Sequence, residues 1–307
     1  MSIGQIFPLI LCLCVLPDPR PTLTAIIDLN MEPWFDDWSH IQHAEHFDGR
    51  SKLRDRDLQR DFECLNDVRL LNERIRAGSG QLVLEIGCAT GEFYRYLRMR
   101  HPGLAYFGID ISEPAVARAR DKFPQGRFFV TQPEWKISDV LMKAGLTETP
   151  QTVYAKDVVH HQTRPLEFVT DLVTCASKMT IMRCRTKDRG GTEWDPEKSC
   201  QYHYSGWMPY IVTNLSELID HIRSLVPKSE IVVWRNYMVL GGRHNRYLPK
   251  DCYLKETGTA ETAVGVFVET EHPGKITIQD RPDANPSYTL THFASSGLRF
   301  LVRRVWR

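Results

Sequence analysis

One stretch of the chain, residues 82–93 (LVLEIGCATGEF), limits the folds that are open to it. It begins with a short apolar run that carries an acid near its end. A turn of small residues follows, and then a helix-like segment, residues 92–100. This order predicts a buried parallel strand, a tight loop and the N-terminus of a helix. Gly87 and Gly91 allow a sharp turn and leave space for a ligand against the backbone.

A second apolar run, residues 104–109, ends in Asp110. If the two runs form neighbouring parallel strands, a carboxylate at the tip of the second strand is placed to hold two ribose hydroxyls. The sequence therefore predicts that a nucleotide-like ligand lies across the loop that follows the first strand.

Two families of nucleotide-binding folds share this layout. Dinucleotide-binding folds require Gly-x-Gly-x-x-Gly beside a pyrophosphate, whereas this chain has Glu85-x-Gly87-x-Ala89-x-Gly91. A carboxylate would repel a pyrophosphate, but it would attract a cationic sulfonium and an amino group. The stretch resembles the first motif of the class I S-adenosylmethionine (SAM) dependent methyltransferases and departs from it only in having Ala89 for the middle glycine. The resemblance extends from about residue 82 to residue 269.

This resemblance implies a fold, a cofactor and a set of binding residues. The implied fold is α/β, a doubly wound, seven-stranded, mostly parallel sheet of the class I methyltransferase type with an N-terminal helical cover and a C-terminal β extension. The implied cofactor is SAM, whose amino acid end faces Glu85 and whose ribose binds Asp110. Gln132 stands after the third strand, where family members often carry an acid for the adenine amino group. The implied cofactor-binding residues are Glu85, Gly87, Cys88, Ala89, Gly91, Asp110, Ile111 and Gln132.

Composition and pattern divide the chain into four segments. Residues 1–30 are an apolar, proline-rich tail, for which three explanations stay open: translated sequence upstream of a start at Met31, a packed or disordered tail, and a signal peptide. Residues 31–80 show helical periodicity and predict a helical cover. Residues 81–271 are predicted to be the SAM-binding methyltransferase domain, and residues 272–307 a β extension.

The bulk composition argues against several classes of function. A formal net charge of +1 gives no strong field for nucleic acid or a membrane surface. The apolar run near the N-terminus is too short to span a bilayer, and a SAM enzyme needs cytosolic cofactor, so we expect a cytoplasmic protein. Eight scattered cysteines are not a disulfide framework. Histidines at 40, 43 and 46 drift around a helix, so we expect no metal site. The oligomeric state stays open.

The predicted fourth strand, residues 152–159, leads directly into His160 and His161. Ligands of open α/β sheets bind outside the carboxyl ends of the strands, and in the resembled family this strand ends beside the transferred methyl group. Asp157, His160 and His161 are therefore the predicted catalytic residues. A histidine that only bonds the backbone and a structural Asp157 are the alternatives.

A long insertion, residues 185–208, follows the predicted fifth strand. Loops of this length inside a compact domain are usually functional, and aromatic faces pack well on ring or sugar surfaces. The predicted substrate-contacting residues are Trp194, Tyr202, His203, Tyr204 and Trp207. The alternative is a loop that is held against the core by the packing of its aromatic side chains.

The sequence thus predicts a SAM-dependent methyltransferase that transfers a methyl group by direct displacement to an oxygen or nitrogen of a small-molecule acceptor. Two alternatives stay open. A SAM-binding protein without turnover would keep the cofactor motif and lack a working acceptor site. An NAD(P)-dependent reductase would use the same Asp110, but it expects glycine at position 89 and no acid at position 85.

Overall fold

The computed structural model describes residues 50–75, 80–132, 136–203, 206–237, 246–247 and 258–284, with the backbone alone at residues 202, 203, 206, 207, 246 and 247. The predicted tail and most of the predicted β extension lie outside this part of the chain.

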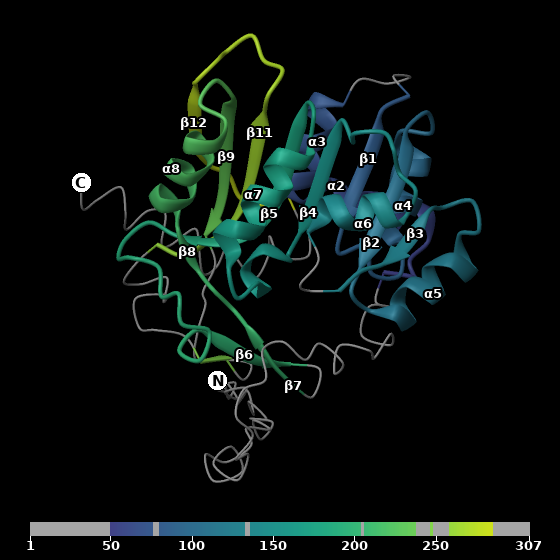
Figure 1. Ribbon diagram of the computed structural model, residues 1–307, viewed down its shortest axis with the longest axis horizontal. Coiled ribbons are helices and arrows are strands. Elements are labelled where there is room, and N and C mark those ends of the chain that lie inside the picture. The colour runs from purple at the N-terminus through teal and green to yellow at the C-terminus, as the bar shows by residue number, and fades with distance from the viewer. Residues whose placement is uncertain are drawn as a thin grey trace, which may run out of the picture. The chain divides into compact units, whose positions relative to one another are not determined.

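A main sheet of nine strands organises the described chain, in the order β12-β9-β11-β5-β4-β1-β2-β3 with β8 paired to β5 (Figure 1). Strands β1 to β5 are parallel, and β11 is antiparallel to both of its neighbours, β5 and β9. The predicted class I methyltransferase type of sheet is confirmed, and β8 and β12 are additions to its seven strands. The strands are β1 (Leu82–Ile86), β2 (Ala105–Asp110), β3 (Phe128–Val130), β4 (Thr152–Lys156), β5 (Met179–Lys187), β8 (Thr213–Asn214), β9 (Glu230–Tyr237), β11 (Ala260–Phe267) and β12 (Ile276–Asp280).

Helices cover both faces of this sheet because side chains alternate between the faces along each strand. On β1, Leu82, Leu84 and Ile86 pack with α6, α7 and α8, whereas Val83 packs with α2, α3, α4 and α5. The first set of helices lies in front of the sheet in Figure 1. The helices are α2 (Asp55–Glu63), α3 (Asn66–Arg74), α4 (Glu92–Arg100), α5 (Glu113–Lys122), α6 (Ile137–Lys143), α7 (Pro165–Cys175) and α8 (Leu215–Leu225).

Two of the predicted boundaries are wrong. The fourth strand, β4, ends at Lys156 and not at residue 159, because Asp157 adopts a positive φ of 58° and a short 3-10 helix, η3 (Val159–His161), follows. The insertion after β5 is also not an irregular loop throughout. Its first residues extend β5 to Lys187, and its last part forms a hairpin that lies below the main sheet in Figure 1. The hairpin strands are β6 (Cys200–His203) and β7 (Gly206–Pro209), and β10 (Arg246–Tyr247) pairs with β6.

A buried cluster of charges joins α3, β5, β11 and the segment after β12. The guanidinium of Arg183 on β5 donates to Asp67 at 3.1 Å and to Asp283 at 2.9 Å, and it also pairs with Glu261. Asp67 is fully buried and accepts a further hydrogen bond from the Tyr154 hydroxyl. The cluster therefore ties the helical cover to the middle of the sheet.

The substitution Asp67→Ala should lower the free energy of unfolding by about 3–5 kcal/mol, because it breaks a buried ion pair and leaves an Arg183 N–H and the Tyr154 hydroxyl without their acceptor. Urea unfolding measures the loss. Glu167→Ala is the control, since Glu167 pairs with Arg164 at 3.5 Å on an exposed face, where a salt bridge is worth about 0–1 kcal/mol. Equal effects of the two substitutions would contradict the importance of the buried cluster.

Candidate functional site

The loop between β1 and α4 turns through three residues with positive φ: Gly87 at 80°, Ala89 at 46° and Gly91 at 85°. L-residues with a side chain rarely adopt this conformation. Position 89 therefore has the backbone that the resembled motif usually gives to glycine, although the residue is alanine. The N–H groups of Gly87 and Cys88 both donate to the carbonyl of Ile109, at 2.8 and 3.0 Å, so the loop is fixed to the end of β2.

Two of these positions leave little room for a side chain. A Cβ on Gly87 would lie 2.5 Å from a methyl group of Val158, just after β4. A Cβ on Gly91 would lie 3.0 Å from the Phe123 ring and 3.1 Å from the Phe128 ring. Gly87 is therefore needed for space as well as for φ, whereas a side chain at position 91 would require the two phenylalanine rings to shift by a few tenths of an ångström.

Asp110 fastens the loop from the end of β2. One carboxylate oxygen accepts the N–H of Ala89 at 2.8 Å, and the other accepts the N–H of Ser112 at 2.9 Å. Burial raises the pKa of Asp110, while these backbone donors lower it, and the net pKa lies above the usual value. Each carboxylate oxygen has two lone pairs, so both keep acceptor capacity for ribose hydroxyls.

Glu85 is a buried carboxyl group at the end of β1 and accepts a hydrogen bond from the Tyr106 hydroxyl on β2. Burial raises the pKa of Glu85 to about 8. Gly108 makes this contact possible, because a Cβ there would lie 2.5 Å from the Tyr106 oxygen. Tyr106 was not among the site residues predicted from the sequence. The sequence does contain a signal for this contact. Tyr106 and Gly108 are two residues apart on one strand and so lie on the same face of β2, and a buried tyrosine hydroxyl needs a hydrogen-bond partner.

The other predicted cofactor residues also lie around this edge of the sheet. Cys88 is buried in the loop, Ile111 is half-buried between Asp110 and Ser112, and Gln132 is exposed two residues after β3. All three follow the carboxyl ends of parallel strands, which is the edge where ligands bind in open α/β sheets.

His160 and His161 lie in the η3 turn that follows β4, at the same edge of the sheet. His160 is 1% exposed and His161 is half-buried. Nδ1 of His161 lies 2.9 Å from the carbonyl oxygen of Pro209, at the end of β7. A carbonyl only accepts, so this contact places the proton of neutral His161 on Nδ1 and leaves the Nε2 lone pair as the basic site.

Asp157 is held by cations. Its carboxylate accepts from Lys156 at 2.8 Å and from Arg185 at 3.0 Å. Burial alone would raise the pKa of Asp157, but Lys156 and Arg185 lower it, with smaller effects from Arg183 and His160, and the net pKa is well below its usual range. A carboxylate with so low a pKa is a weak proton acceptor at neutral pH, so the geometry favours a histidine over Asp157 as a base.

The predicted substrate-contacting residues are placed in part. Trp194 lies between β5 and β6 and is 40% exposed. Tyr202, His203 and Trp207 lie on the β6–β7 hairpin, where the structure describes the backbone alone, and Tyr204 lies outside the described residues. The end of β7 meets the histidine turn through Pro209, so the insertion does reach the candidate site.

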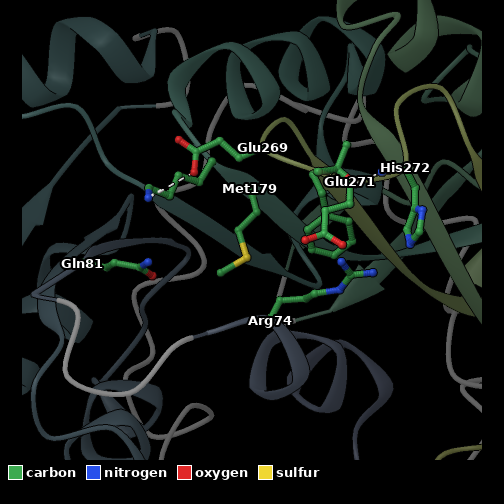
Figure 2. Close-up of a pocket in the computed structure, with 9 residues that line it drawn as sticks. Arg74, Gln81, Met179, Glu269, Glu271 and His272 are labelled. Atoms are coloured by element: carbon green, nitrogen blue, oxygen red, sulfur yellow. Dashed lines mark hydrogen bonds and ion pairs between the residues drawn. The ribbon is translucent and has the colours of Figure 1, made fainter.

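A pocket of about 460 Å³ lies at the opposite edge of the sheet (Figure 2). Gln81 precedes β1, Met179 begins β5 and Phe267 ends the antiparallel β11, so all three lie away from the cofactor loop. Two of its charged residues, Lys178 and Glu269, pair with each other at 3.2 Å. We therefore do not assign it to the candidate site. Its lining residues are Arg74, Gln81, Lys178, Met179, Phe267, Glu269, Thr270, Glu271 and His272.

Within the described ranges, no three histidine, cysteine, aspartate or glutamate side chains gather in an arrangement that could hold a metal ion. No helix in the same part of the chain has the length and apolar character needed to cross a membrane.

Comparison with known families supports the same interpretation of the loop and its surroundings. Residues 84–178 match the family model described as "Methyltransferase domain". This range contains the glycine loop, Asp110 and the histidine turn. This part of the chain is therefore similar to methyltransferase domains. The order of the sheet agrees with the class I type of fold that the sequence motif predicted, and the match supports SAM as the cofactor.

The chain is also similar to individual proteins. Trans-aconitate 2-methyltransferase of Variovorax paradoxus (strain S110) is 33% identical over 73 residues, which is 24% of this chain and 26% of that protein. The match thus spans about a quarter of that relative's length.

Two solved structures resemble the fold. Phosphoethanolamine N-methyltransferase 2 of Haemonchus contortus, in complex with phosphomonomethylethanolamine and S-adenosylhomocysteine, is 13% identical with a TM-score of 0.47, and covers 66% of this chain and 52% of its own. The N-terminal domain of EvdMO1, with S-adenosylhomocysteine bound, is 13% identical with a TM-score of 0.44, and covers 71% and 82%. Similarity this low supports no statement about the substrate.

The substitution Gly87→Ala should abolish binding of S-adenosylhomocysteine and lower stability by about 1–3 kcal/mol, because it combines a positive φ with a clash against Val158. Calorimetry and thermal unfolding measure the two effects. Gly145→Ala is the control, since Gly145 also has positive φ, at 69°, but nothing lies within 4 Å of its added Cβ. Gly87→Ala protein that binds with wild-type affinity would contradict the predicted cofactor loop.

Proposed function

We propose that this chain is a SAM-dependent methyltransferase that methylates an oxygen or nitrogen of a small-molecule acceptor. The observation that carries the proposal is the pair of buried carboxyl groups, Glu85 and Asp110, at the carboxyl ends of adjacent strands on either side of a loop with positive φ. A ligand with an amino group and two neighbouring hydroxyls would supply hydrogen-bond donors for the remaining lone pairs of these two carboxyl groups.

The hydrogen-bonding groups of the site match those of SAM residue by residue. Asp110 would accept from the ribose hydroxyls while it keeps its backbone bonds to Ala89 and Ser112. Glu85 would face the amino group, and Gln132 would be the nearest polar group for adenine. SAM supplies an activated methyl group, so the protein mainly has to align the acceptor with it.

The histidine turn supplies the acceptor side of the proposal. With its Nδ1 proton donated to Pro209, His161 would present Nε2 as a proton acceptor. A base of this kind serves an acceptor that loses a proton during the reaction, such as a hydroxyl or an ammonium group. It would be of no use to a carboxylate acceptor, which is already ionised at neutral pH.

Two alternatives are weaker. An NAD(P)-dependent reductase would place a pyrophosphate beside Glu85, where the carboxylate would repel it when ionised. A SAM-binding protein without turnover would not need a histidine with a fixed tautomer beside the cofactor loop. The curated relative is named for trans-aconitate, but the match is too short to transfer that acceptor to this chain.

We place the reaction in the cytoplasm, where SAM is made, with a small-molecule acceptor and no nucleic acid, since the net charge is +1. A screen of cell extracts with isotope-labelled SAM tests this directly. Label that appears in a small molecule only with active protein supports the proposal. Intact SAM binding with no labelled product from any extract would favour the binding protein.

Binding of S-adenosylhomocysteine at about pH 6.5 should release a proton. Free Glu85 is mainly protonated below its raised pKa of about 8, whereas the α-ammonium group of the ligand, which is charged at this pH, favours the carboxylate. Affinity should therefore rise with pH between about 6 and 7, by up to about tenfold per unit. Without ligand the sign is opposite, since the contribution of Glu85 to stability is lost as pH rises through about 8.

Calorimetry in buffers with different ionisation enthalpies counts this proton. The variant Glu85→Gln has no carboxyl proton to lose and serves as the control. Equal proton release by the wild type and Glu85→Gln would show that Glu85 does not face the amino group.

The substitution His161→Ala should lower turnover by about a hundredfold or more, because a general base contributes roughly that much. The affinity for SAM should change little. His221→Ala is the control, since His221 on α8 forms a hydrogen bond with Thr170 on α7, between two helices. A pH–rate profile with no pKa near neutrality, together with near-normal turnover of His161→Ala, would make this histidine structural.

A further inference from the structure

Arg185 on β5 is held on all three edges of its guanidinium group. Nη1 donates to Asp157 at 3.0 Å, Nη2 pairs with Glu261 at 3.0 Å, and Nε donates to the Tyr210 hydroxyl at 3.0 Å. The side chain is only 10% exposed. Two of its partners are carboxylates that balance its charge, but Tyr210 is neutral, so charge balance alone does not explain the third contact.

Tyr210 is the residue that the histidine turn packs against. Its ring lies 4.9 Å from the His160 ring at 74° and 5.6 Å from the His161 ring at 64°, both edge-on contacts. The side chain is 2% exposed. The two histidine rings are 4.1 Å apart. Tyr210 therefore forms one wall for both imidazoles.

The peptide group between Pro209 and Tyr210 joins this wall to the tautomer of His161. Its carbonyl faces Nδ1 of His161 at 2.9 Å, while its N–H, on the opposite side, donates to the carbonyl of Ser199 at 2.8 Å. Because a peptide group is planar, its orientation is set once the N–H and the Tyr210 side chain are held. The next N–H, that of Ile211, donates to the His160 carbonyl at 2.8 Å.

We infer that Arg185 is a positioning residue: through the Tyr210 hydroxyl it fixes the Pro209 carbonyl and so keeps His161 in the tautomer with its proton on Nδ1. Asp157 and Glu261 orient Arg185 in turn. A role for this arrangement in turnover rests on the proposed function, whereas the arrangement itself does not.

Arginine suits this role because its planar fork donates in three fixed directions at once. A lysine could balance the two carboxylates, but it has no Nε–H in that fork to reach the tyrosine. Phenylalanine at position 210 would keep the ring contact and lose only the hydroxyl. The two conservative substitutions therefore remove the same hydrogen bond from opposite ends.

The test is a nitrogen-15 NMR measurement of the His161 tautomers at about pH 8.5, where imidazoles are neutral. Wild-type protein should show mainly the tautomer with the proton on Nδ1. Tyr210→Phe and Arg185→Lys should each raise the ratio of the other tautomer by roughly fivefold or more, the change expected when the hydrogen bond between His161 and Pro209 is lost together with the Arg185–Tyr210 contact. The measurement needs no methyl acceptor and no cofactor.

Tyr237→Phe is the matched control, because its hydroxyl donates to Asp188 at 2.8 Å in a different network. It should leave the His161 tautomers unchanged. Tyr210→Phe protein that is folded and keeps the wild-type ratio would overturn the inference, even if Arg185→Lys fails to fold. A ratio that shifts equally in Tyr237→Phe would overturn it too, since the effect would then be general.

Once an acceptor is known, Tyr210→Phe should lower kcat with little change in the KM for SAM. Wild-type protein that shows the tautomer effect but transfers no methyl group would contradict the proposed function and leave the positioning role standing. Wild-type turnover that Tyr210→Phe does not reduce would remove the catalytic part of the inference.

Discussion

The candidate site depends on one carboxylate that bridges two backbone segments. Asp110 accepts from Ala89 in the loop after β1 and from Ser112 before α5. These bonds hold the loop in a positive-φ conformation and fix the start of the next helix at the same time. The same two oxygens are the acceptors proposed for the cofactor ribose. In this proposal one group both holds the loop and binds the ligand, so its loss would affect the shape of the site as well as its affinity.

The acceptor side depends on a second set of buried charges. Arg183 connects β5 to α3 and to the segment after β12, while Arg185, two residues along on the same strand, turns toward Asp157, Glu261 and Tyr210. Buried ions of this kind are strongly destabilising when one partner is removed. Structural stability and the placement of the histidine turn thus come from neighbouring positions of a single strand.

Much of the cofactor half could be predicted from the sequence, because it depends on local patterns. The apolar run before Glu85, the two glycines and Asp110 lie within short segments whose order alone indicates strand, loop and strand. The acceptor half of the site could be predicted less well than the cofactor half. The contacts of Tyr210 with Arg185 and of Pro209 with His161 join residues distant in the chain. Asp157, whose positive φ ends β4 early, likewise pairs with Arg185, 28 residues further along the chain.

The most direct test of this account is calorimetric titration of the purified chain with S-adenosylhomocysteine and, separately, with NAD. The account predicts binding of S-adenosylhomocysteine, no heat with NAD, and a loss of about 3 kcal/mol or more in binding free energy for Asp110→Ala, which removes acceptors for two hydrogen bonds to a charged group. Tight binding of NAD without any heat from S-adenosylhomocysteine would contradict it.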